Sequence, residues 1–450
     1  MKNTSIKIIL TALICALLPI GAPLTAQVKR SYKTKPHEST PEGKRHKDQV
    51  SNTHKITVGM DEVQNDSTEM LLNLFYVDQF RHFRDPRAPY FMFLSKAGNV
   101  ALGVGGQVNV RGWYDWAGSI PSMDFVTYDI PIPNDPANSR NLSASAAYTS
   151  LFFTLLGSNA QLGEYMAYFQ ADFNGYNHRG FRIKKAYVSL GDWTAGYATT
   201  TFEDTKAEPS TVDGEGPNGV NSRTNVLLRY MHTFKDKWTV AGSLEFPSQS
   251  LNADGTNTKA ANPYLPDIAA FGQFEWNNGA SHIRLSGLLR TLTYRDLIRQ
   301  RNYNITGWGL QLSTIIKACN PLNFIGIFSV GRGHASYTTD LGNGSFDLIQ
   351  VEDDPGKLYA PVAGGIVVGA QYYFRHNIFA NLAFSEQIYY PKTSPRNDQY
   401  KYGLYAVGNV FWDITPRFEV GLEYLHGKRA NFNGMSGSAN RLMMMMMMSF

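Results

Sequence analysis

The sequence predicts an all-β protein, specifically a transmembrane antiparallel β-barrel of about 16 strands, with short turns at one rim and long loops at the other. Three observations carry this prediction. Apolar and polar residues alternate over many short segments, connections between them alternate between short and long, and no apolar run of about 18 residues follows the N-terminal 26. The composition agrees, because 40 Gly, 25 Tyr and a mean hydropathy of -0.28 suit strands with one apolar and one wet face.

Residues 1–26 have the pattern of a secretory signal peptide. Two lysines precede an apolar run, and small residues suit cleavage before Gln27. Lipidation of Cys15 is not favoured, because Ile14 precedes it where a small residue is needed. Removal of the signal leaves Cys319 as the one cysteine of the mature chain, so no intramolecular disulfide is expected.

Charge is unevenly distributed along the chain, whose formal net charge is +5. Residues 27–60 contain eight Lys or Arg against three Asp or Glu. We interpret this segment as a basic, mobile periplasmic tail, followed by a short helical or linker segment over 61–97 and a barrel over 98–450. A basic tail on a near-neutral body argues against a nucleic-acid-binding domain, and no nucleic-acid partner is expected.

The predicted strands begin at residue 98 and continue to the C-terminus. They are 98–116, 142–157, 164–174, 181–190, 193–202, 224–234, 238–246, 267–276, 282–294, 303–318, 322–337, 360–375, 378–391, 400–414, 418–432 and 439–450. Short connections such as 191–192 and 376–377 alternate with long ones such as 117–141 and 203–223. This alternation is typical of a single-chain outer-membrane barrel, with its turns and both termini in the periplasm and its long loops outside the cell.

The two faces of each strand differ in chemistry. Within 164–174, Tyr165 and Phe169 belong to an apolar set, while Gln170 and Asp172 belong to the opposite set. An Arg or Lys facing lipid at the bilayer midplane costs ~2–4 kcal/mol, so the charged face should line a wet interior. Aromatic residues also collect near strand ends, as expected at the membrane interface.

The last strand places Met444, Met446, Met448 and Phe450 on one face. An apolar ladder ending in a terminal Phe resembles the assembly signal of outer-membrane barrels, although a buried strand of a soluble protein would fit this segment alone. The run of six Met from 443 to 448 also puts Met at inward positions. Alternation between polar and apolar faces does not explain that feature.

The long loop at 203–223 is the most distinctive part of the chain. Its flanks, 193–202 and 224–232, alternate as strands do. Its middle is rich in Pro, Gly, Asn and Asp and cannot continue a ladder.

This hairpin resembles the DcaP-like family of trimeric outer-membrane porins over about a tenth of the chain. The matching residues are Gly196, Thr200 (where Ser is expected), Phe202, Asp204, Pro209, Thr211, Asp213, the Gly-Pro-Asn-Gly of 216–219, Arg223, and Arg229 with Tyr230. Arg182, Lys184 and the Ala-Tyr pair at 186–187 fit as well. The resemblance implies a sixteen-stranded barrel, a homotrimer, and a loop folded inward to narrow a pore for small anionic solutes such as dicarboxylates. Some members carry an N-terminal coiled coil, but no sustained heptad precedes this barrel.

The residues give independent support for an inward loop. Asp204, Glu208, Asp213 and Glu215 could form an acidic side of a constriction, opposed by inward-pointing Arg111, Arg229, Arg284 and Arg290, with Arg223 at the end of the loop. In the alternative, the loop acids lie at the surface and the arginines pair with lumenal Asp172, Glu245, Glu275 and Glu423.

The function predicted from these features is that of an outer-membrane porin of a Gram-negative cell, in contact with membrane lipid, for passive diffusion of small anions. The alternative is a plugged barrel with a structural or surface-binding role. An enzyme ranks third, because the sequence contains no GxSxG elbow and no phosphate-binding loop motif. With no HExxH motif and no paired Cys, neither a metal nor another cofactor is expected.

Overall fold

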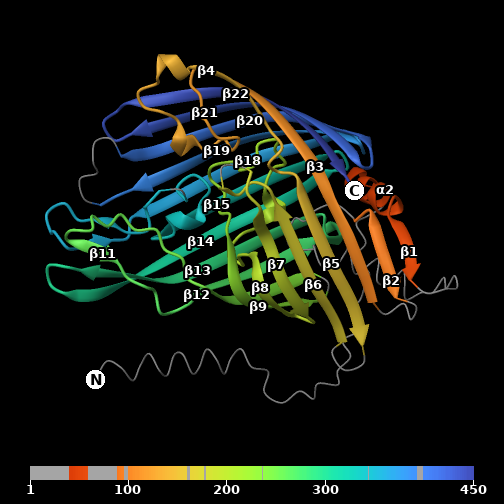
Figure 1. The fold of residues 1–450 in the computed structure, drawn as a ribbon, viewed down its shortest axis with the longest axis horizontal. Coiled ribbons are helices and arrows are strands. Elements are labelled where there is room, and N and C mark those ends of the chain that lie inside the picture. The colour runs from red at the N-terminus through yellow and green to blue at the C-terminus, as the bar shows by residue number, and fades with distance from the viewer. Residues whose placement is uncertain are drawn as a thin grey trace. The chain divides into compact units, whose positions relative to one another are not determined.

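The computed structural model describes residues 40–58, 89–95, 100–159, 163–176, 179–235, 237–342, 344–392 and 399–450. In this part of the chain, 16 antiparallel strand positions close into a barrel (Figure 1). The barrel closes where the last strand, β22, pairs with the first wall strand, β3, over Gln107 to Trp116. Because a closed barrel has no free edge, every wall strand can satisfy its backbone polar groups within the protein.

The wall strands follow one another in chain order. They are β3 (Val100–Trp116), β4 (Arg140–Ser145) with β5 (Ser150–Asn159), β6 (Gly163–Asp172), β7 (Arg182–Leu190), β8 (Trp193–Thr199), β9 (Thr224–Phe234), β10 (Trp238–Glu245), β12 (Asp267–Trp276), β13 (Ser281–Asp296), β14 (Arg301–Cys319), β15 (Leu322–Arg332), β18 (Val362–Arg375), β19 (Ile378–Tyr390), β20 (Tyr400–Thr415), β21 (Phe418–Asn431) and β22 (Ser436–Ser449). β4 and β5 share one wall position, since both pair with β3.

Connections at the two ends of the barrel differ in length, as the sequence predicts. Short turns join β7 to β8, β14 to β15 and β18 to β19, and we call this end the turn rim. The opposite end, the loop rim, contains long connections with small elements of their own. These are β11 (Thr258–Ala260), β16 (Ile349–Gln350), β17 (Leu358–Tyr359) and the 3-10 turns η2 (Thr127–Asp129), η3 (Pro136–Asn138), η5 (Thr205–Ala207) and η7 (Ala335–Tyr337). Another 3-10 turn, η6 (Asn277–Gly279), lies in the β12–β13 turn.

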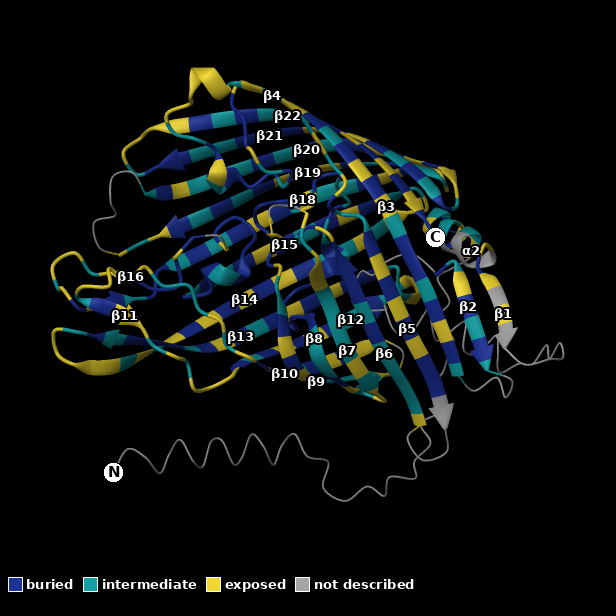
Figure 2. Ribbon diagram, in the orientation of Figure 1, coloured by how far each residue is buried: buried dark blue, intermediate teal, exposed yellow. Residues whose placement is uncertain are grey.

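Burial alternates along the strands with a period of two, which Figure 2 shows as alternating dark and light bands. In β13, Arg284 and Arg290 are 0% and 1% exposed, whereas Leu285 and Leu289 are 58% and 49% exposed. The charged face is therefore the interior face and the apolar face points outward. This confirms the assignment made from alternation alone.

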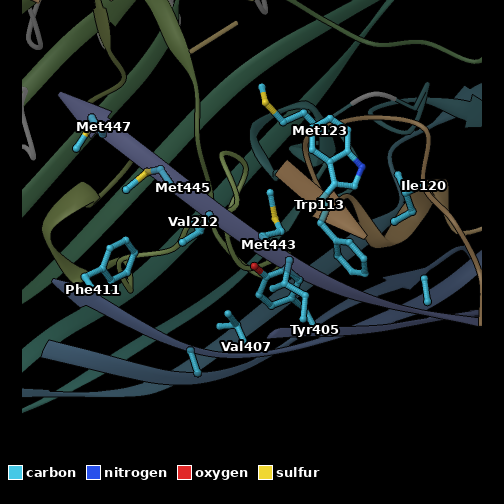
Figure 3. Close-up of a cluster of buried hydrophobic side chains, with 14 of the residues drawn as sticks. Trp113, Ile120, Met123, Val212, Tyr405, Val407, Phe411, Met443, Met445 and Met447 are labelled. Carbon is cyan, nitrogen blue, oxygen red and sulfur yellow. The ribbon is translucent and has the colours of Figure 1, made fainter. Parts of the chain in front are cut away.

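Inward-facing methionines of β22 pack into an apolar cluster. Met443, Met445 and Met447 are at most 8% exposed, whereas Met444, Met446 and Met448 of the opposite face are about half exposed. The inward set lies beside Trp113, Phe411 and Val212 in Figure 3. Val212 belongs to the loop between β8 and β9. The three inward methionines therefore form an apolar surface, which we call the apolar seat, and Val212 of the loop packs against it.

The predicted strand over 142–157 is interrupted. Ser145 Oγ accepts a hydrogen bond from Ala147 N, and Thr149 N donates to Ala146 O, so the chain turns before β5 begins. This turn brings Tyr148 against Arg111 of β3, which points into the interior. The break therefore adds an aromatic ring to the inner face.

The N-terminal segment differs from the tail predicted for 27–60. Helix α2 (Pro41–Ser51) and strand β1 (His54–Val58) lie within it. β1 pairs in parallel with β2 (Phe91–Ser95), and β2 pairs with β3 beyond the point where β22 ends. Among the described residues, no helix is both long and apolar enough to cross a bilayer. The predicted signal peptide, and the helix expected with Met70 and Leu74, lie outside the described residues.

Replacement of Met445 by Ala is expected to destabilise the barrel by about 2–5 kcal/mol, the usual cost of emptying a packed position. Met446→Ala, on the outward face of the same strand, removes the same atoms from a side chain that is 46% exposed and should cost much less. Equilibrium unfolding in denaturant measures both changes. Equal destabilisation by the two variants would contradict close packing of Met445 in the apolar seat.

Candidate functional site

The loop of residues 200–223 lies inside the barrel and follows its inner wall. At its start, Thr200 Oγ1 donates to both carboxylate oxygens of Glu245 on β10, at 2.9 and 2.8 Å. Further on, Asn409 Nδ2 of β20 donates to Ser210 O at 2.9 Å. On the way back, Asn221 Nδ2 donates to Gln311 of β14 at 2.8 Å. The loop is therefore bonded to the wall from β10 to β20.

The first strong attachment of this loop is Asp204. Its carboxylate accepts a hydrogen bond from Ser313 Oγ at 2.5 Å, lies 2.8 Å from His282 Nε2 and is 3.6 Å from the guanidinium of Arg284. Burial alone would raise the pKa of Asp204, but the charges of Arg284 and His282 outweigh it and hold this pKa well below its usual range. Removal of one partner from a buried charge pair of this kind is costly, because the other charge stays buried without its partner.

The second attachment holds the tip of the loop. Glu423 of β21 accepts hydrogen bonds from the backbone N of Val212 at 2.6 Å and of Asp213 at 2.7 Å. Asp213 in turn accepts a hydrogen bond from Phe125 N at 2.9 Å, so the 117–139 connection rests on the tip. Gly421 leaves room for this contact, since a Cβ there would lie 2.8 Å from Val212 Cγ2.

The inner face of β3 and β7 carries a second group of charged side chains. The guanidinium of Arg111 lies 4.2 Å from the ring centre of Tyr148, and Lys184 Nζ lies 5.5 Å from the same centre. Tyr148 donates a hydrogen bond to Asp124 at 2.5 Å. Arg182 pairs with Asp172 at 2.8 Å. The side chains of Arg182 and Lys184 remain 43% and 35% exposed, so both present positive charge to water.

Glu215 lies just beyond the loop tip, close enough to this group for its charge to interact with those of Asp124 and Arg182. Burial, together with the neighbouring charges of Asp124 and Asp213, raises the pKa of Glu215 to about 8, while Arg182 acts in the opposite direction. We call Arg111, Asp124, Tyr148, Arg182, Lys184 and Glu215 the charged cluster. It combines cations from the wall with acids from two loops.

The residues that the sequence predicts for the constriction fall into two groups in the structure. Arg111 and Glu215 belong to the charged cluster. Arg284 and Arg290 point inward but are enclosed, Arg284 beside Asp204 and Arg290 between Asp267 at 3.0 Å and Asp347 at 3.1 Å. The remaining predicted residues support the loop or lie along it.

Among those remaining residues, Arg223 donates to Asn225 Oδ1 at 3.0 Å and to Ser336 O at 2.6 Å. Arg229 donates to Thr199 O at 3.1 Å, Asp213 is buried at the tip, and Glu208 is half-buried. Asp172 pairs with Arg182, which is not one of the four arginines of the alternative pairing, and Glu245 and Glu423 accept hydrogen bonds from the loop. Tyr148, Asp124, Arg182 and Lys184 of the charged cluster are not among the pore residues that the sequence predicts.

Within the described residues, no group of three or more His, Cys, Asp or Glu side chains could hold a metal ion. The loop and cluster contain Arg, Lys, Tyr and carboxylates arranged around the inner wall. Such an arrangement can attract, orient or exclude charged solutes.

A closed barrel with an apolar outer face and a charged, loop-bearing interior has the architecture of the porins. A family model described as DcaP outer membrane protein matches residues 95–450. The chain belongs to this family and is an outer-membrane protein.

Solved structures share the fold. The outer membrane channel DcaP of Acinetobacter baumannii is 22% identical, with a TM-score of 0.69, over 80% of this chain and 99% of that one. An anion-selective porin from Comamonas acidovorans is 10% identical, with a TM-score of 0.52, over 78% of this chain and 100% of that one. A loop-deletion form of OmpT from Vibrio cholerae is 10% identical, with a TM-score of 0.51 and the same two coverages. No curated protein sequence matches the chain.

Glu423→Gln is expected to loosen the loop tip, because one amide oxygen replaces two carboxylate oxygens that accept from two backbone N–H groups. Loss of a buried acceptor costs about 1–3 kcal/mol, which a barrel can tolerate. We expect larger and noisier single-channel conductance from a normally folded barrel. Glu352→Gln, an exposed loop change of the same charge, is the control, and identical currents from the two variants would contradict the anchoring role.

Proposed function

We propose that this protein is an outer-membrane porin through which small hydrophilic anions diffuse passively, past a constriction formed by the 200–223 loop. The observation that carries the proposal is the charged cluster. The loop is bonded to the wall from β10 to β21, and in the cluster its tip region approaches the part of the wall formed by β3 and β7. The path for solutes then lies between Glu215 and the cations Arg111, Arg182 and Lys184.

The placement of charge favours anions. Arg182 is exposed and Lys184 half-buried on the wall, both beside Asp172, while Glu215 is neutral over part of the physiological pH range because its pKa is about 8. Arg111 and Lys184 lie against one tyrosine ring. Two cations beside one ring concentrate positive charge at one part of the wall, which supports anionic, dicarboxylate-like solutes. Charged side chains around a narrow passage set selectivity most strongly, because field strength increases at short range.

The proposal includes the assembly and its orientation. Family resemblance supports a homotrimer in contact with outer-membrane lipid. The turn rim is placed in the periplasm together with both chain termini, and the loop rim outside the cell, because single-chain bacterial barrels keep their short turns on the periplasmic side. The pairing of β22 with β3 puts the end of the wall at the turn rim, which supports this orientation.

The double variant Arg182→Gln/Lys184→Gln is expected to shift the reversal potential in a salt gradient toward cation preference, because two exposed cations leave the path. Lys259→Gln/Lys357→Gln removes the same charge from the loop rim, where Lys259 is exposed and Lys357 is 58% exposed, and serves as the control. Planar-bilayer recording measures both. An unchanged reversal potential in the first variant would remove these side chains from the path.

Anion preference is expected to increase as pH falls from 9 to 7. A carboxyl with a pKa of about 8 is charged above that pH and neutral below it, so the path loses one negative charge. Glu215→Gln should show at pH 9 the preference that the unmodified protein reaches at pH 7, and should lose this part of the pH dependence. Reversal potentials recorded at both pH values test this, and an unaltered pH profile in the variant would contradict it.

A further inference from the structure

Two carboxylates face each other at the turn rim. Asp413 of β20 and Glu419 of β21 are direct cross-strand partners, and their side chains are only 5% and 6% exposed. Both occupy inward positions of their strands. Like charges directly opposite each other on a sheet are destabilising. This pair therefore requires a cation.

Arg45 of helix α2 supplies that cation. Its guanidinium forms ion pairs with both Asp413 and Glu419 and lies over the ring of Phe379, 4.7 Å from its centre. Phe379 stacks in turn on Phe411, with ring centres 5.1 Å apart. Burial alone would lower the pKa of Arg45, but the two carboxylates outweigh it and raise this pKa. A guanidinium fork held between two carboxylates above an aromatic face is a specific receptor site for arginine.

Further contacts place α2 along the rim. Asp48 lies 3.4 Å from His376 in the turn between β18 and β19, and Glu42 is close enough to Lys317 of β14 to interact with its charge. Gly43 N donates to Thr40 Oγ1 at 3.0 Å at the start of the helix. An 11-residue helix is about 16 Å long. Figure 1 shows α2 beside the C-terminus, at the end of the barrel where β22 finishes.

We propose that α2 is a releasable stopper in the turn-rim mouth of the channel, held there by Arg45 in the Asp413–Glu419 pair. This inference rests on the proposed channel function. Docked, the helix occupies part of the mouth on the β14–β21 side and narrows the opening that leads to the path between Glu215 and the cations of β3 and β7. When the helix is released, water fills the mouth and solutes can enter.

The contacts are suited to release. The Asp48–His376 contact joins side chains that are 50% and 46% exposed, and such surface pairs contribute about 0–1 kcal/mol. A helix of this length is marginal in isolation. The half-buried guanidinium of Arg45, paired with two buried carboxylates, makes the strongest of these contacts of α2, so a change at this residue should free the helix while the barrel wall stays intact.

The helix position is tested first, by a measurement independent of current. Cys319 is exposed at the turn rim, and Asn52 is exposed at the end of α2. With spin labels on Cys319 and on Asn52→Cys, pulsed dipolar spectroscopy of the full mature chain in detergent is expected to give one narrow distance. Adding Arg45→Ala should broaden this distribution, whereas Lys44→Ala, an exposed change of equal charge on the same helix, should leave it narrow.

Single-channel recording then tests the stopper role. Arg45→Ala should raise unitary conductance, and Lys44→Ala should not. Asp413→Asn/Glu419→Gln should reproduce the Arg45→Ala conductance, and combining all three changes should add nothing further. Heat-modifiable migration on gels confirms folding of each variant.

Docking of the helix, its stopper role and the channel function predict different results in these two experiments. A narrow distance that survives Arg45→Ala, or a broad one in the unsubstituted helix, overturns docking through Arg45. A distance that broadens without a rise in conductance overturns the stopper role alone. Absence of current from every folded variant overturns the channel function itself.

Discussion

The interior of this barrel depends on the pairing of wall side chains with the backbone and side chains of the 200–223 loop. Glu245, His282, Ser313 and Glu423 come from four separate strands, and all are nearly inaccessible to solvent. If the loop moved away, each of these buried side chains would lose hydrogen bonds that the loop supplies, although Glu245 and Glu423 would keep those from Asn225, Ser243 and Asn409 on the wall. The loop in turn could not remain folded against one side of the barrel without them. This mutual requirement explains why a segment rich in Gly, Pro and Asn has one defined path.

The path of the loop determines which inward residues it covers. Arg284 and Arg111 both belong to the interior face, but Arg284 is enclosed beside Asp204 whereas Arg111 faces Tyr148 and the charged cluster. The apolar seat formed by Met443, Met445 and Met447 is a second place where the loop covers inward residues. A methionine pointing inward is unfavourable in an open, wet lumen, but it is suitable where Val212 covers it.

Much of the fold could be predicted from the sequence, because a period of two and the lengths of connections are local properties. The site was less predictable. Alternation correctly directs Arg284 and Arg290 inward, yet it carries no information about which interior positions a loop will cover. Tyr148 enters the site through a turn that interrupts a predicted strand. Arg45 lies in a segment whose basic composition indicates a tail, and its partner Asp413 is 368 residues away in the chain.

The central claim is that a loop-narrowed, open path for anions crosses this barrel. The most direct test is single-channel recording of the unmodified protein in a planar bilayer under a salt gradient. The account predicts discrete conductance steps with a reversal potential that favours anions. Silence from a correctly folded barrel, or a reversal potential that favours cations, would contradict it.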